Sequence, residues 1–547
     1  MATGCLAHAG VASAFPITDP ANPGVVTAPA AAPDQADLRN QLQLHNGFAA
    51  PAGGGWTFLP RISLQEAFTD NVFQSATDRR YDFITSITPG ITILGDSPGA
   101  QVTFDYAPSL NWYARTPHES GISQQLLGTG LFTVVPDSIY VDARAVSGVG
   151  TTNGAFGAFG TYGGVNAAGG VQLGTGPTGG VGAPAALSKQ NQTQYSSFSL
   201  SPYWLHTFKD IGTARVGYSF TESSFSNVGS AFPLFVPTGG NSQRLTTNEG
   251  FATFQTGDYF GRIQDVITAD VSNSIGTGNA IPGSNATITS RTSYALYDWV
   301  SVFGTVGYEN ISYGGTGQPH VADEIWNLGT TVIPNPDSSI SASYGHQNGF
   351  NSFQFNGYYA VTARTTLSAG YTTALQTQLQ QIQNELNQGA INVNGTLVNS
   401  QTGQPIFLTN PALGVQSGVF ETKTFSLTAT TTLDRDQFSL NGQYSQYMPV
   451  SSVAGTNAIS SHATIASLSW TRQINENLSL YSGITYSVGS FSGSGNTQTL
   501  GATANLVYQL SETVTGHLLY SFYDQRSSAP GQTIYQNLLV VGISKQF

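Results

Sequence analysis

The chain has 547 residues, of which only 9% are charged, against about 25% in a typical soluble protein. Its net charge of −12 argues against a nucleic-acid partner, and the single Cys5 excludes a disulfide framework and a thiolate metal site. No run of about 18 apolar residues is present, which excludes a membrane-spanning helix. A polar but nearly uncharged chain with 11% aromatic residues is typical of a water-filled membrane barrel rather than of a disordered chain.

The amino-terminal part differs in composition from the rest. Residues 1–14 end in Ala12-Ser13-Ala14, which fits a signal-peptidase site, so we expect them to be the remnant of a signal peptide. Residues 15–55 are rich in Ala, Pro and Gly and are predicted as a periplasmic lead-in, too short for a folded plug domain. Residues 56–547 are predicted as one barrel domain.

From Trp56 onward the chain repeats one unit: a strand, a tight turn, a second strand and a longer loop. Within the segment 478–488, apolar residues alternate with small or polar ones at a period of two, which predicts a strand with one apolar face. A soluble sandwich needs more aliphatic core, and a propeller repeats a motif in each blade. Residues that set turn dihedrals mark one end of the hairpins: 95–100, 136–137, 209–212, 334–337, 434–436, 475–477 and 511–512.

The sequence therefore predicts an all-β fold: a single transmembrane antiparallel β-barrel of about 22 strands, in a range of about 18 to 24. Short periplasmic turns alternate with long extracellular loops. The expected location is the outer membrane of a bacterial cell.

The last strand, 533–547, shows the same alternation. Its odd-numbered positions are mostly apolar and end on Phe547, whereas the even set is smaller and more polar, apart from Ile534, Leu538 and Val540. It resembles the closing strand of outer-membrane barrels, in which the terminal aromatic residue belongs to the signal read by the barrel-assembly machinery. The resemblance implies that the signal here includes Gly542, Ile543 and Phe547. The simpler alternative is an ordinary amphipathic edge strand.

Several short sequence segments indicate which family of outer-membrane barrels the chain resembles. They are EAFTDNVF at 66–73, ITPGI at 87–91, VGYE at 306–309, the stretch from Trp326 to Asp337, and SYG at 343–345. Together these resemble the outer-membrane β-barrel porin 2 family over residues 56–547. Members of that family often accompany exopolysaccharide synthesis and export genes, some of them exosortase-linked. The resemblance implies a role in envelope or polysaccharide traffic.

The alternation also predicts which charged side chains point into the lumen. The set contains five bases and four acids, a near balance that favours internal ion pairs and a weakly selective aqueous path. The competing interpretation of each residue is a brace for the barrel wall, and Asp142 and Arg144 share one face of a strand. The nine lumen-lining candidates are Arg61, Asp105, Arg115, Asp142, Arg144, Arg215, Arg262, Asp270 and Glu309.

Catalytic and metal-binding patterns are weak. His517 and Ser521 fall on the inner face of one strand, but their Cα atoms are about 13 Å apart at strand rise, too far for a Ser–His pair. Asp70 and Asn71 are interpreted as a loop that bonds its own backbone, in preference to a calcium site with Asp78. No metal or cofactor is expected, and the chain is not expected to be an enzyme.

Two long connections fall at 149–192 and 375–418. In the second, Leu379, Ile382 and Leu386 recur at helical spacing over residues 376–388, which predicts a short amphipathic helix. This helix either folds into the barrel mouth as a constriction, with the wall near Tyr358 and Tyr481 as its packing surface, or lies over the rim.

The function expected from these observations is a porin-like or polysaccharide-export-associated conduit. One alternative is a structural barrel that anchors envelope or extracellular polysaccharide, and a second is a barrel enzyme acting on lipid. Expected partners are outer-membrane lipid, the barrel-assembly machinery, and polysaccharide or export-system proteins.

Overall fold

The computed structural model describes residues 55–151, 192–226, 243–278, 280–315, 317–387, 389–391, 397–399, 418–452, 458–492, 495–528 and 533–547. The predicted long loop at 149–192 lies almost wholly outside these residues. Within the described residues, no helix is both long and apolar enough to cross a membrane.

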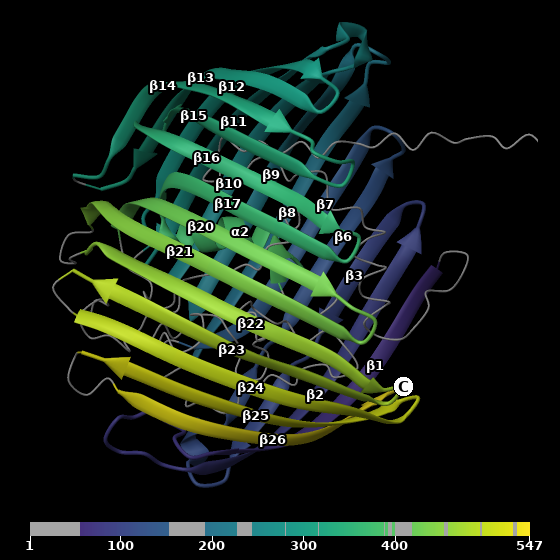
Figure 1. The fold of residues 1–547 in the computed structure, drawn as a ribbon, viewed down its shortest axis with the longest axis vertical. Coiled ribbons are helices and arrows are strands. Elements are labelled where there is room, and N and C mark those ends of the chain that lie inside the picture. The colour runs from purple at the N-terminus through teal and green to yellow at the C-terminus, as the bar shows by residue number, and fades with distance from the viewer. Residues whose placement is uncertain are drawn as a thin grey trace, which may run out of the picture.

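The chain forms one closed antiparallel sheet (Figure 1). β1 pairs with β2 on one side and with the last strand, β26, on the other, in register from Arg61↔Gln546 to Thr69↔Leu538. The last strand is therefore no edge strand, because β25 and β1 occupy both of its sides.

The sheet contains 24 strand segments, but two barrel strands are each interrupted once. β3 and β4 both pair with β2 in one continuous register, from Ile91↔Tyr106 to Ile84↔Tyr113, with a break at Ala107 and Pro108. β6 and β5 pair with β3 and β4 in the same way. Subtracting these two breaks from 24 gives 22, so the predicted closed 22-strand barrel is confirmed.

Most elements follow each other as neighbours in the wall. The first half contains β1(Gly55–Thr69), β2(Asp82–Ser97), β3(Ala100–Tyr106), β4(Ser109–Tyr113), η1(Pro117–Glu119), β5(Gly121–Ser123), β6(Leu126–Val135), β7(Ile139–Thr151), β8(Gln192–Thr207), β9(Gly212–Ser226), β10(Gln243–Thr256), η4(Asp258–Phe260), β11(Ile263–Thr277), β12(Gly283–Tyr297) and β13(Val300–Tyr313). The second half contains β14(His320–Val332), β15(Ser339–Gln347), β16(Phe350–Thr362), β17(Thr365–Thr377), α2(Gln378–Asn387), β18(Gly389–Ile391), β19(Leu397–Asn399), β20(Gly418–Thr432), β21(Asp436–Ser452), β22(Ser461–Asn475), β23(Leu478–Phe491), β24(Gly495–Ser511), β25(Val514–Ser527) and β26(Ile534–Gln546).

The two faces of the wall differ as the alternation predicts. On β1, Trp56, Phe58, Ile62 and Leu64 are exposed on the outside, while Arg61 and its inward neighbours are buried. Stacked aromatic pairs such as Phe438–Trp470 and Trp56–Phe58 lie outside near the short turns. An apolar exterior with aromatic residues near the strand ends suits a lipid environment.

One end of the barrel carries only short connections, such as 98–99, 298–299, 363–364 and 512–513. The predicted turns all fall at this end, which we call the short-turn end. β1 begins and β26 finishes there as well (Figure 1). The opposite end, which we call the loop end, carries the connection that contains α2.

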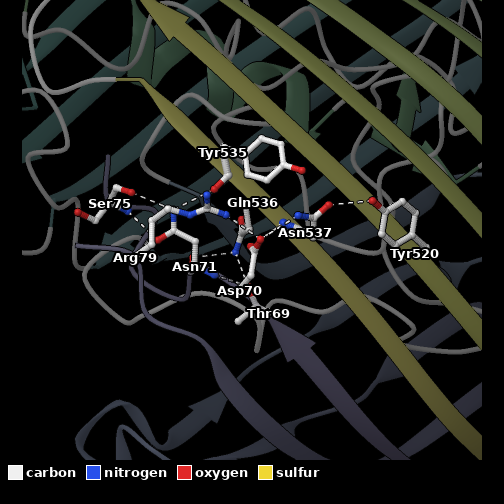
Figure 2. Close-up of polar contacts among 9 residues, drawn as sticks. All are labelled: Thr69, Asp70, Asn71, Ser75, Arg79, Tyr520, Tyr535, Gln536 and Asn537. Atoms are coloured by element: carbon white, nitrogen blue, oxygen red, sulfur yellow. Dashed lines mark hydrogen bonds and ion pairs between the residues drawn. The ribbon is translucent and has the colours of Figure 1, made fainter. Parts of the chain in front are cut away.

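Side chains extend the closing seam beyond the last strand pair (Figure 2). Asp70 accepts bonds from the backbone and side chain of Asn537, both at 2.8 Å, and forms an ion pair with Arg79 at 2.7 Å. Asn71 donates to Tyr535 O at 3.0 Å and binds the backbone of Ser75. These residues thus act partly as the predicted self-bonding loop and partly as a clasp that joins β1 to β26.

An apolar cluster supports this clasp. Ile534, Leu538 and Val540, the even-numbered positions that blur the alternation of the last strand, belong to it. Val72, from the connection after β1, is fully buried in the same cluster. The seam therefore has its own small hydrophobic core on the inner side of the wall.

Candidate functional site

The helix α2 confirms the helix predicted at residues 376–388 and begins with a capping box. Thr377 Oγ1 accepts the N–H of Gln380 at 3.1 Å, and Gln380 Oε1 accepts the N–H of Thr377 at 3.0 Å. This reciprocal pair satisfies two backbone donors at the helix start. The helix therefore begins where β17 ends.

β17 turns inward before it reaches α2. Its pairing with β16 starts at Phe355↔Tyr371, so residues 372–377 pair with β20 alone. Tyr313 of β13 donates a 3.0 Å bond to Leu375 O, although β14 to β16 separate the two strands along the wall. The chain thus crosses into the lumen, where Leu375 packs with Ile311 and Val419.

Polar side chains of α2 reach two distant parts of the inner wall. Gln383 accepts a bond from Thr247 of β10 at 2.8 Å and donates to Ser223 of β9 at 3.1 Å. Gln381 accepts a 3.2 Å bond from Tyr447 of β21. Because β11 to β17 and β20 separate β10 from β21, α2 spans the lumen instead of lying over the rim (Figure 1).

The apolar side of this helix is buried as predicted. Leu379 is 7% exposed and Ile382 is fully buried, whereas the side chain of Leu386 lies outside the described part of the chain. The wall residues that hold the helix by hydrogen bonds include Thr247, Ser223 and Tyr447. Tyr358, which the sequence suggested as a packing surface, instead lines a cavity at the short-turn end.

α2 also carries a buried carboxylate. Glu385 Oε1 accepts a 2.8 Å bond from Gln381, which links it indirectly to Tyr447. Oε2 is buried without a partner among the described residues. Burial raises the pKa of Glu385 to about 8, because the charged form loses its hydration.

Three further carboxylates lie on the inner wall and form what we call the acid belt: Glu249, Asp270 and Glu309. Asp270 pairs with Thr287, and Thr287 pairs with Glu309, so they follow one row across β11, β12 and β13. Glu249 lies on the adjoining β10, and all three side chains are at most 3% exposed. None forms a salt bridge within the described residues.

The belt separates two hollows in the same part of the wall. On the loop side, a small hollow of about 50 Å³ lies between α2 and the wall, beside Thr247, Ser272 and Asn285. On the short-turn side, a larger cavity of about 570 Å³ is lined by residues of β10 to β16. Hollow, belt and cavity therefore follow one another along β10 to β13.

Four of the nine predicted lumen residues form two ion pairs on the inner wall. Arg61 makes a bidentate contact with Asp105 at 2.6 and 2.8 Å, and the carboxylate also accepts from Thr92. Arg144 binds Asp142 at 3.0 Å, on the shared face that the sequence indicated.

Arg215 also lies on the inner wall, over the rings of Tyr203 at 4.0 Å and Phe251 at 5.3 Å. The structure places two predicted lumen residues elsewhere. Arg115 lies beyond the end of β4, exposed and stacked 3.9 Å over Tyr81 on the outer side. Arg262 is exposed in the turn after η4. The predictions for Arg115 and Arg262 extended the alternation past the strand ends, where it no longer determines which side of the wall a side chain faces.

Several inner-wall charges were missed, among them Glu249, Arg291 and Asp82, which is fully buried at an inward position of β2. Glu249 follows the same alternation as Leu245, Thr247 and Phe251, so the pattern itself was sufficient to find it. Arg291 lies 3.8 Å over the ring of Phe303. With Arg115 and Arg262 removed and these residues added, the set has more acids than bases, and two of its acids are neutralised by arginine in ion pairs. The expected near balance thus becomes a slight acidic excess that is concentrated in the belt.

The proposed assembly residues and the His–Ser positions all lie near the closing seam. Ile543 and Phe547 are exposed on the outer side, and Phe547 N donates to Pro60 O at 2.9 Å. Gly542 faces inward opposite His517. His517 and Ser521 are both buried on the inner face, and no hydrogen bond joins them within the described residues.

No family model and no curated protein matches the sequence. Solved structures resemble the fold: the FrpB iron transporter of Neisseria meningitidis has a TM-score of 0.49 at 11% identity, over 93% of this chain and 84% of its own. The ferric-catecholate import receptor Fiu of E. coli gives 0.47 at 10%, covering 89% and 81%. The siderophore receptor PirA of Pseudomonas aeruginosa gives 0.44 at 9%, covering 90% and 80%.

The closed sheet, the apolar exterior and the polar inner wall define the class. The chain is a 22-strand bacterial outer-membrane β-barrel.

Proposed function

We propose that the protein is a passive conduit for hydrophilic solutes, with α2 as its constriction. The observation that carries the proposal is the attachment of α2 to β9, β10 and β21 through single glutamine side chains. A few neutral hydrogen bonds contribute about 1 kcal/mol each, so they position the helix without locking it. A purely structural plug is better served by a broad apolar interface.

The inner wall suits uncharged, hydrogen-bonding solutes. Its buried polar residues are mostly Ser, Thr, Asn and Gln, and Arg61, Arg144 and Arg215 are paired with carboxylates or stacked on rings. Where its carboxylates are ionised, the belt adds a preference for cations over anions, because negative charge on the wall of a pore lowers the energy of a cation there.

The resemblance to the β-barrel porin 2 family supports the finer proposal that the conduit serves polysaccharide export. In that setting its partners are the barrel-assembly machinery during insertion and export-system proteins at the short-turn end, which faces the periplasm in outer-membrane barrels.

The alternative is a structural barrel that anchors polysaccharide, and the complete burial of Ile382 favours it, since α2 is well seated. Conductance in a planar bilayer separates the two. A conduit gives discrete channels with a cation preference, whereas an anchoring barrel gives none even though its heat-modifiable mobility in SDS shows that it is folded.

A further inference from the structure

The larger cavity lies on the inner wall at the short-turn end, on the far side of the acid belt from α2. Its volume of about 570 Å³ is within the range of about 300–1,000 Å³ typical of small-ligand sites. Hydroxyl and amide groups dominate the polar part of its lining: Gln255, Gln264, Thr268, Thr289, Ser293 and Ser301.

Aromatic rings form the apolar part. Phe303 is 3% exposed beneath the guanidinium of Arg291, which lies 3.8 Å above its ring. Tyr358 and Tyr297 stand at the sides, with 42% and 64% of their surface exposed. Stacking on Phe303 restricts the orientation of the guanidinium plane, and Arg291 lines the cavity.

This combination matches one chemical class. A sugar ring presents an axial C–H face that packs on an aromatic ring, and equatorial hydroxyls that both donate and accept. Planar amides and guanidinium groups pair with adjacent hydroxyls, while Ser and Thr match them singly. A phosphate ligand needs several cations, and Arg291 is accompanied here by the carboxylates of Asp298 and Asp337. A lipid chain needs a lining without so many polar groups.

We propose that this cavity is a saccharide-binding vestibule. It binds a short segment of a glycan at the short-turn end before the glycan reaches the acid belt and α2. The direction of travel rests on the conduit proposed above. Binding itself does not, because it requires only the cavity.

The test is isothermal titration of the purified barrel in detergent with three probes: maltohexaose, cellohexaose and a mannuronate hexamer. A polyethylene glycol of similar mass controls for non-specific uptake into the lumen. We expect at least one of the glycans to bind, and polyethylene glycol not to. The proposal is overturned if none of the three binds above the polyethylene glycol baseline.

Two variants locate the site. Arg291→Gln and Tyr358→Ala should each weaken binding at least tenfold. Arg215→Gln is the matched control, because Arg215 also stacks on aromatic rings of the inner wall but does not line this cavity. If Arg215→Gln weakens glycan binding as much as the two cavity variants do, in samples that keep heat-modifiable mobility, the location of the site in this cavity is contradicted.

Glycan binding and channel conductance are separate results, so the vestibule and the conduit can be refuted independently. A barrel that binds glycan but never conducts retains the vestibule and refutes the conduit. A barrel that conducts but binds no glycan refutes the vestibule alone.

Discussion

His517 lies directly across from Gly542 on the neighbouring strand, and its imidazole fills the space that a side chain at position 542 would need. On the other side, Gln65 of β1 pairs with the same glycine. The glycine therefore permits a close row of side chains across β25, β26 and β1, at the place where the barrel closes. This steric role is separate from any role of Gly542 in assembly.

Gly542→Ala should destabilise the folded barrel by about 1–3 kcal/mol, because the added methyl group meets a ring that cannot move through the wall. Urea titration of the heat-modifiable form measures the change. The double variant Gly542→Ala with His517→Ala should recover most of the loss. If the single and double variants are equally unstable, the contact with His517 is not the cause.

The pair of Arg61 and Asp105 braces the first strands. Asp105→Ala should lower the free energy of unfolding by about 3–5 kcal/mol, since it leaves a buried guanidinium without its carboxylate. Replacing both, as Arg61→Met with Asp105→Leu, should be close to neutral because no unpaired charge remains. The same urea titration checks both, and a double variant as unstable as the single one contradicts the bracing role.

The fold was largely predictable because a period of two fixes the side of the wall on which each residue lies. The same rule identified the outward and inward sets of the last strand, and residues that set turn dihedrals gave the location of the short turns. It did not reveal the break at Ala107 and Pro108, since the residues on both sides keep one register across the gap. Closure between β1 and β26 follows from long-range pairing that a local pattern does not encode.

The site was only partly predictable. The spacing of Leu379 and Ile382 predicted α2, and Thr377 with Gln380 offered an unused capping signal for its start. The path of the helix across the lumen depends on β17 leaving β16, a tertiary event. Arg115 and Arg262 were misplaced for a related reason: beyond a strand end, direction depends on neighbours such as Tyr81 rather than on parity.

The cation preference of the channel tests whether the acid belt makes the passage selective. At alkaline pH, at which the buried carboxylates are ionised, a triple variant, Glu249→Gln with Asp270→Asn and Glu309→Gln, should move the reversal potential in a KCl gradient toward zero, because the negative potential of the passage is removed. Glu66→Gln is a control that changes the charge of the exposed outer face. A reversal potential that the triple variant leaves unchanged excludes the belt as the source of selectivity.

The buried carboxylate of Glu385 makes docking of α2 dependent on pH. Its pKa rises from 4.5 to about 8 on burial, so the docked state favours the proton. The stabilisation is complete below about pH 4.5 and is lost as the pH rises through 8, since ionisation then competes with burial beside Tyr447. Conductance should therefore be larger at pH 9 than at pH 6.

Glu385→Gln removes the ionisable group and should keep the low conductance at both pH values. The comparison of the two proteins at pH 6 and pH 9 is the measurement. A pH response of the same size in Glu385→Gln assigns the effect to another group.

We expect α2, held across the lumen by Gln381 and Gln383, to limit passage. The direct measurement is single-channel conductance of the intact chain, of Gln381→Ala with Gln383→Ala, and of a chain lacking residues 378–387, each with verified heat-modifiable mobility. Conductance should rise in the double alanine variant and several-fold in the deletion. If all three folded proteins give no conductance, α2 is not the constriction of a conduit and the barrel is an anchor.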